Sequence, residues 1–116
     1  MKNILLFGAG KSATVLIDYL LSNAEKEDWQ LTVVDADINL AQSKIGISPF
    51  GKAVSFDIND EADRKRFISD ASIVISLLPP TLHTIVAKSC IELNKSLLTA
   101  SYIDDEIRNL QSEDRK

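Results

Sequence analysis

The sequence predicts an α/β fold: a doubly wound parallel sheet with helices on both faces. Two observations lead to this prediction. Short apolar segments alternate with amphipathic ones along the chain, and a glycine-rich motif directly follows the first apolar segment. The apolar segments have the length and composition of strands that are buried on both faces, as in parallel sheets. The expected strands are residues 4–7, 31–34, 53–56, 73–78 and 97–100.

Helices are expected between these strands. Residues 13–24 and 82–93 both carry apolar side chains at helical spacing, so each makes one apolar face. Two weaker candidates begin at acids that can cap a helix, namely Asp37 and Asp60. We expect the strand order 3-2-1-4-5, because crossovers are right-handed and the nucleotide motif follows the first strand.

The chain is expected to form one domain over residues 1–110. That domain ends in an amphipathic stretch from residue 104 to 110. The polar tail at residues 111–116 is expected to begin a connection to a further domain.

The composition indicates an ordinary globular domain, with 45% hydrophobic and 26% charged residues and a net charge of −4. Acids and bases are interspersed, so the chain lacks the clustered basic face of a nucleic-acid-binding protein. No apolar run is long enough for a signal peptide or a membrane span. A single cysteine excludes an internal disulfide and a thiolate metal site, and we expect a cytoplasmic location.

The glycine-rich segment, Gly-Ala-Gly-Lys-Ser-Ala, matches the G-x-G-x-x-[GA] pattern of dinucleotide-binding folds. Gly8 would allow a tight turn, Gly10 would let a pyrophosphate approach the backbone, and Ala13 would keep the helix near the sheet. Lys11 and Ser12 lie where the helix begins, and free N–H groups and a positive dipole end attract phosphates there. The motif therefore predicts a dinucleotide cofactor at this loop.

The same segment also resembles the Gly-Lys-Ser end of a P-loop. P-loop spacing would place the first glycine at position 5, which is Leu5, inside the first expected strand. The loop is too short to wrap phosphates around a lysine, so a nucleoside triphosphatase is disfavoured.

Asp35 ends the second expected strand, about 20 residues after the glycine motif, where dinucleotide-binding folds place an acid for the adenine ribose. A carboxylate there would accept hydrogen bonds from the ribose hydroxyls and repel a 2′-phosphate. No arginine closely follows Asp35, and the next base is Lys44. We therefore expect NAD, rather than NADP, as the cofactor. The alternative role for Asp35 is that of a solvated acid at a strand end.

Ligands of this fold lie across the carboxyl ends of the strands, which makes other residues there candidates. Asp57 would face the adenine or lead the next helix, and Leu78 and Pro79 would run near the ribose on the nicotinamide side. Ser101 follows the fifth expected strand, where a substrate would face the nicotinamide. His83 stands in the first turn of a helix, where histidine is usually solvated, so no catalytic residue is assigned.

These residues make the chain similar to the N-terminal domain of the saccharopine dehydrogenase family. The resemblance lies in Ile-Leu-Leu-Phe-Gly-Ala-Gly at 4–10, Ile-Val-Ile-Ser-Leu-Leu-Pro at 73–79, His83, Val-Ala-Lys at 86–88 and Leu-Thr-Ala-Ser-Tyr at 98–102. It implies a nicotinamide-dependent oxidoreductase acting on the secondary amine of saccharopine, in lysine metabolism. It also implies a further domain that binds the amino-acid or keto-acid substrate, so this chain alone would show no turnover.

A second interpretation is a regulatory nucleotide-sensing module, like the Rossmann domains that gate potassium transport. Those domains resemble this chain in size and in the acid after the second strand. They typically show Gly-Asp at the end of the third strand, where this chain has Phe56 and Asp57. A gating module would assemble as an oligomeric ring, whereas a dehydrogenase domain would be largely monomeric.

Overall fold

The computed structural model describes residues 2–11 and 13–99. Its strands are β1 (Lys2–Phe7), β2 (Trp29–Val34), β3 (Gly51–Val54), β4 (Ile73–Ser76) and β5 (Leu97–Thr99). Its helices are α1 (Ala13–Ser22), α2 (Ala24–Glu27), α3 (Ile38–Ile45), α4 (Glu61–Asp70) and α5 (Pro80–Glu92).

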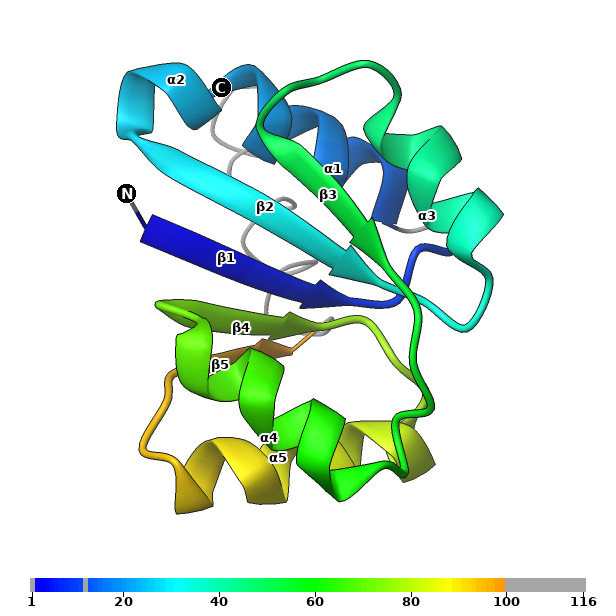
Figure 1. Ribbon diagram of the computed structural model, residues 1–116, viewed down its shortest axis with the longest axis vertical. Helices are drawn as coiled ribbons and strands as arrows, with labels where there is room; N and C mark the ends of the chain where they lie inside the picture. Colours follow the sequence, from blue (N-terminus) through cyan, green and yellow to red (C-terminus); the bar gives the residue numbers. More distant parts are fainter. Residues whose placement is uncertain (1, 12, 100–116) are drawn as a thin grey trace, which may run out of the picture.

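The strands form one parallel sheet in the order β3-β2-β1-β4-β5, with helices on both faces (Figure 1). The predicted fold class and strand order are therefore confirmed.

The central strand β1 is buried along most of its length. It pairs in parallel with β2 and β4, and the register aligns Leu6 with Val33 on one side and with Ile75 on the other. Residues 4–7 all have less than a tenth of their surface exposed. A strand enclosed by two neighbours and two helical layers needs apolar side chains at every position, which explains the continuous apolar run.

Each face of the sheet carries its own hydrophobic core. The core on the face of α1 and α3 contains Ile4, Leu6, Ile17, Leu31, Val33 and Ala41 among its buried residues. The core on the face of α4 and α5 contains Leu5, Phe7, Val34, Ile68, Val74 and Val86. Successive residues of β1 thus point to opposite cores, as the two-residue period of a strand requires.

The sole cysteine, Cys90, belongs to the core beneath α5 and is 2% exposed. Burial in apolar surroundings raises the pKa of its thiol, because the thiolate would lose its solvation. Cys90 is therefore a packing residue. Within the described residues no helix is long and apolar enough to span a membrane.

Both acids expected to cap helices do so. Asp37 accepts hydrogen bonds from the backbone N–H groups of Asn39 and Leu40 at 3.0 and 3.2 Å, and α3 begins at the next residue. Asp60 accepts from the N–H of Asp63 at 3.1 Å and starts α4 in the same way. These side chains satisfy N–H groups that lack an intrahelical partner.

The first expected helix is split in two. The side-chain amide of Asn23 donates to the Tyr19 carbonyl at 2.8 Å, which competes with continuation of α1. The short helix α2 follows and ends at Asp28, whose φ of 57° reverses the chain into β2.

Two strands end earlier than the apolar pattern predicts. β3 ends at Val54 and β4 at Ser76, two residues before the expected ends in both cases. Beyond β3, the Ser55 hydroxyl donates to the Ala36 carbonyl at 3.1 Å, and the ring of Phe56 packs edge-on against Phe7 at 6.3 Å. Ser55 and Phe56 thus lie outside the sheet and line a cleft instead.

Candidate dinucleotide-binding site

The turn after β1 requires glycine at its first position. Gly8 has φ of 102°, a region that side-chain-bearing residues rarely adopt. Its N–H donates to the Val34 carbonyl at 2.8 Å, which ties the turn to the end of β2. A Cβ atom at Gly8 would lie 3.4 Å from the backbone carbon and oxygen of Leu77. Gly8 therefore serves the turn itself, as the motif predicts.

Gly10 differs, because nothing in the described protein explains its lack of a side chain. Its φ is not positive, it is exposed, and a Cβ atom there would meet no atom within 4 Å. The space above Gly10 is open to a group that approaches from outside the fold. A dinucleotide pyrophosphate needs such a cradle, so this loop fits the cofactor that the motif predicts.

The start of α1 lies directly behind this cradle. The N–H of Ala13 donates to the Gly10 carbonyl at 3.0 Å, and the N–H of Thr14 donates to the Lys11 carbonyl at 3.3 Å. Ala13 is fully buried in the core, which places the helix close to the sheet. Lys11 is exposed beside the loop. Ser12, which the motif also singles out, lies outside the described residues.

The carboxylate of Asp35 holds the glycine loop in place. One oxygen, Oδ2, accepts from the backbone N–H of Ala9 at 2.8 Å, and the other, Oδ1, accepts from the N–H of Asp37 at 2.9 Å. Asp35 itself is half-buried. Both oxygens therefore bind backbone groups of the protein, and this carboxylate ties the glycine loop to the segment that follows β2.

A cleft of about 500 Å³ opens beside the loop at the carboxyl ends of the strands. This volume is within the usual range for small-molecule sites of roughly 300–1,000 Å³. The cleft is lined by Phe7, Val34, Asp35, Ala36, Ser55, Phe56, Asp57, Ile58, Asn59, Leu78 and Leu82. Most of these are apolar, which suits a flat heterocyclic base.

Three predicted residues, Asp35, Asp57 and Leu78, meet in this cleft. Asp57 uses its Oδ1 to accept from the backbone N–H of Asn59 at 2.9 Å, so it shapes the turn that closes one end. Pro79 is exposed and directly precedes α5. Ser101 lies outside the described residues.

The structure places a second cation at the start of α1, a position that the sequence does not indicate. The ammonium of Lys44, on α3, donates to the hydroxyl of Thr14 at 2.5 Å. Because Lys44 is distant from the glycine motif in sequence, only the packing of α3 beside α1 reveals it. None of the described residues that line the cleft is basic. Positive charge near the cleft comes from Lys11 in the glycine loop and from Lys44 beside Thr14.

Comparison with known proteins supports this picture. Residues 4–116 match the family described as "Saccharopine dehydrogenase NADP binding domain". Saccharopine dehydrogenase [NADP(+), L-glutamate-forming] of Saccharomyces cerevisiae is 38% identical over 97% of this chain and 24% of its own length. Alpha-aminoadipic semialdehyde synthase of Arabidopsis thaliana is 35% identical over 89% of this chain and 11% of its own length.

Solved structures of other proteins share the fold of this chain. The apo saccharopine dehydrogenase (L-Glu forming) of S. cerevisiae superposes with a TM-score of 0.77 at 36% identity, over 95% of this chain and 24% of that one. A short-chain dehydrogenase/reductase from Veillonella parvula has a TM-score of 0.69 at 16% identity, over 84% of this chain and 46% of that one, which shows the shared fold alone. The chain spans about a quarter of the length of its yeast relative.

The expectation of NAD over NADP is wrong, because the matched family is an NADP-binding domain and the yeast relative is an NADP⁺ enzyme. The physical reason lies in Asp35, whose two oxygens bind the N–H groups of Ala9 and Asp37. The preference for NAD requires a carboxylate that is free to bind a ribose and repel a 2′-phosphate. On the match over residues 4–116, this chain belongs to the saccharopine dehydrogenase NADP-binding domain family.

Proposed function

We propose that this chain is the NADP(H)-binding part of an oxidoreductase of the saccharopine dehydrogenase type. The observation that carries the proposal is the open cradle at Gly10, set at the start of α1 and beside a cleft of about 500 Å³. The family match and the yeast relatives support the choice of cofactor.

The pyrophosphate would lie over Gly10, where the first N–H groups of α1 and the helix dipole favour negative charge. The adenine would occupy the apolar cleft between Phe56 and Leu78. Its ribose would then run past the end of β2, next to Ala36, which contributes only a small side chain and leaves room for a phosphate on the ribose.

Lys11 and Lys44 would supply the charge that a 2′-phosphate needs. Lys11 projects from the glycine loop into solvent, and the Lys44 ammonium is held beside that loop by the Thr14 hydroxyl. Charge-assisted hydrogen bonds of this kind are roughly twice as strong as neutral ones. Two ammonium groups on the α1 side would offset the acids Asp35 and Asp37 at the end of β2.

When bound, the cofactor supplies hydride for reversible reduction of a C=N bond formed from an amino acid and a keto acid. The described residues of this chain bind and orient the cofactor, and a domain in the rest of the protein would bind the substrate. The relatives are far longer than this chain, which leaves room for such a domain. We therefore expect the 116-residue chain to bind NADPH without saccharopine turnover.

Calorimetric titration with NADPH of the wild-type chain and the variant Gly10→Val tests the proposal. We expect at least about a tenfold loss of affinity, a change of ~1.4 kcal/mol, because the new side chain fills the cradle. The free energy of unfolding should stay within about 0.5 kcal/mol, since the added Cβ meets no protein atom.

Gly46→Val is the matched control. Gly46 also has open space around it, but its φ of 65° strains any side chain and it lies at the end of α3. This variant should lose stability and keep its NADPH affinity. Unchanged NADPH binding in Gly10→Val would contradict the assigned cradle. Saccharopine oxidation by this chain alone would contradict the proposal that a separate domain binds the substrate.

A further inference from the structure

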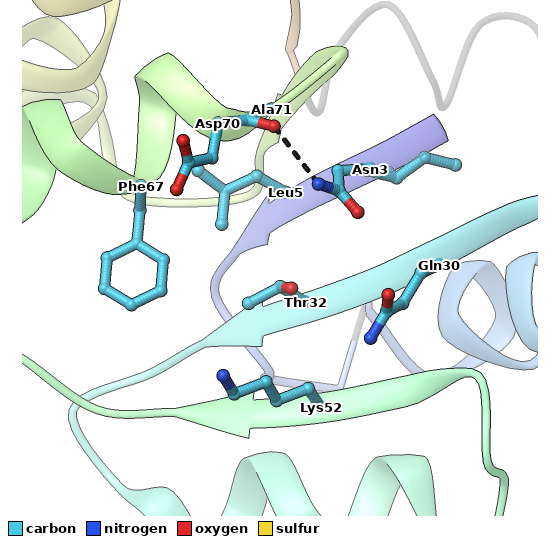
Figure 2. A pocket seen from close by; sticks show the side chains of 9 residues that line it. Asn3, Leu5, Gln30, Thr32, Lys52, Phe67, Asp70 and Ala71 are labelled. Carbon is cyan, nitrogen blue, oxygen red and sulfur yellow. Dashed lines mark hydrogen bonds between the residues drawn. The ribbon is translucent and has the colours of Figure 1, made fainter. Parts of the chain in front are cut away.

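A second cleft lies at the opposite, amino edge of the sheet. Its volume is about 210 Å³, smaller than the roughly 300–1,000 Å³ of drug-sized sites, so it suits only a small ligand. Figure 2 shows its walls, which come from β1, β2, β3 and the end of α4. The lining residues are Asn3, Ile4, Leu5, Gln30, Thr32, Lys52, Phe67, Asp70 and Ala71.

This amino-edge cleft exists because α4 covers only part of its face of the sheet. Leu5, Thr32 and Lys52 stand side by side on three adjacent strands. Leu5 is buried beneath α4, Thr32 is half-buried, and Lys52 is exposed. Parallel sheets are usually covered on both faces and then carry apolar residues throughout. Polar side chains on the uncovered part are adapted to a polar environment or a polar ligand.

The cleft holds one cation and one anion on facing walls. In Figure 2, Lys52 extends from β3 on one side and Asp70 stands at the end of α4 on the other, with Thr32 between them. Within the described part of the chain, neither charged side chain forms an ion pair with the other or with a third residue. Both charges are therefore available to a ligand.

One wall is fixed by hydrogen bonds. The side-chain amide of Asn3 donates to the backbone carbonyl of Asp70 at 3.2 Å, and the backbone N–H of Asn3 donates to the Ser72 hydroxyl at 3.1 Å. These bonds link the start of β1 to the end of α4, so the position of Asp70 relative to the strands is set. The opposite wall is the backbone of β3, which is paired with β2.

We propose that the amino-edge cleft binds a small zwitterion of the α-amino-acid class. The Lys52 ammonium would bind the ligand carboxylate, and the Asp70 carboxylate would bind the ligand ammonium. The half-buried ring of Phe67 would contact an apolar ligand side chain. A phosphate or nucleotide fits poorly, because Asp70 would repel a dianion that has only Lys52 to neutralise it.

This site goes beyond the proposed cofactor function and lies at the other end of the strands. NADPH would bind at the carboxyl edge, so the two binding events can be measured separately. A failure of NADPH binding would contradict the proposed cofactor function, and ligand binding at the amino-edge cleft would be unaffected.

The test is a titration of the ¹⁵N-labelled chain with L-leucine, followed by NMR. L-leucine carries both charges and an apolar side chain. We expect saturable shifts of the side-chain amide signals of Asn3 and Gln30, with a Kd of about 1 mM or tighter. Two analogues test the two charged groups of the ligand separately: 4-methylpentanoate lacks the ammonium, and 3-methylbutylamine lacks the carboxylate. Each should bind at least about tenfold more weakly.

Two variants test the two charged side chains of the cleft separately. Lys52→Met and Asp70→Asn should each weaken L-leucine binding by about tenfold or more, with the NMR spectrum otherwise preserved. Lys88→Met on α5 and Asp18→Asn on α1 are the matched controls, because both residues are exposed and lie outside the cleft. The controls should bind L-leucine as the wild type does.

Three results would overturn the proposal. The first is the absence of saturable shifts at Asn3 and Gln30. The second is equal binding of L-leucine and both analogues, which would mean that the charges do not recognise the ligand. The third is displacement of L-leucine by NADPH, which would make the cleft part of the cofactor site.

Discussion

The two edges of the sheet use their charged side chains in opposite ways. At the carboxyl edge, polar side chains bind the protein itself: Asp35 holds Ala9 and Asp37, and Ser55 holds Ala36. At the amino edge, Lys52 and the carboxylate of Asp70 have no partner among the described residues. The first edge is a scaffold built from side chains, whereas the second presents its charges outward.

This difference shows where recognition resides in each cleft. At the carboxyl edge the side chains fix the backbone, and the exposed backbone and the space above Gly10 are left to meet a ligand. At the amino edge strand pairing and the hydrogen bonds of Asn3 fix the backbone, and the two charged side chains, Lys52 and Asp70, are left to meet a ligand. Substitutions of the side chains that hold the backbone at the carboxyl edge should therefore change stability, whereas substitutions of Lys52 or the Asp70 side chain should change only ligand binding.

The largest effect is expected at Gly8. Gly8→Val forces a branched side chain into a backbone with φ of 102°, with its Cβ 3.4 Å from the Leu77 backbone. We expect the free energy of unfolding to fall by about 1–3 kcal/mol or more, because such a conformation is strained for any residue but glycine. Urea unfolding measures the change. A stability equal to the wild type would show that the turn relaxes freely, and that this edge is not a rigid scaffold.

A pair of acids gives the next comparison. Asp35→Ala leaves the N–H groups of Ala9 and Asp37 without their acceptor, and it should cost about 1–3 kcal/mol of stability. It should weaken NADPH and NADH binding alike, because the loop shape is lost for both. Asp70→Ala should change stability by less than about 0.5 kcal/mol, since an acid in the last turn of α4 opposes the helix dipole.

Thermal melts and titrations of these two variants, made side by side, measure the contrast. Equal destabilisation by both would remove the distinction between the edges. A selective loss of NADH binding in Asp35→Ala, with NADPH binding kept, would return Asp35 to the role of a ribose acid.

The smallest effect is expected from two exposed lysines. Lys11→Met should weaken NADPH binding by about tenfold and leave NADH binding unchanged, because only NADPH carries the 2′-phosphate. Lys52→Met should leave both cofactor affinities unchanged, and neither variant should alter the melting temperature. Equal losses for NADPH and NADH in Lys11→Met would place this lysine at the pyrophosphate instead.

Much of the fold follows from the sequence, because local patterns decide it. The alternation of apolar runs and helical faces predicts the strand order, and Asp37 and Asp60 cap the helices that follow them. Residue spacing also places Gly8 and Gly10 correctly in a turn between a buried strand and a helix. The caps and the turn depend on neighbours within a few positions, and the strand order follows from the alternation of elements and the right hand of the crossovers.

The cofactor preference could not be derived in the same way. Spacing locates Asp35 at the end of β2, yet the direction in which its oxygens turn depends on the glycine loop, 26 positions away. Lys44 likewise reaches Thr14 across 30 positions. Apolar runs also overestimate strands, since Phe56 leaves β3 to pack on Phe7 and Phe67.

The amino-edge cleft is even harder to predict from the sequence. Its walls come from Asn3, Gln30, Lys52 and Asp70, which belong to four separate elements. No motif joins them, and each alone looks like an ordinary surface residue. Only the register of β1, β2 and β3, together with the limited reach of α4, brings them to one place.

The glycine loop depends on parts of the chain that are made much later. Its Ala9 N–H is held by Asp35, and the Phe7 carbonyl just before it accepts from the N–H of Leu77 at 2.9 Å. Ribosomes extend a chain from the N-terminus at about 5–20 residues per second, so the loop emerges before either partner exists. The segment synthesised first thus gains its full set of hydrogen bonds only after Leu77 has been made, and a nascent chain that stalls ahead of β4 carries the motif without the complete site.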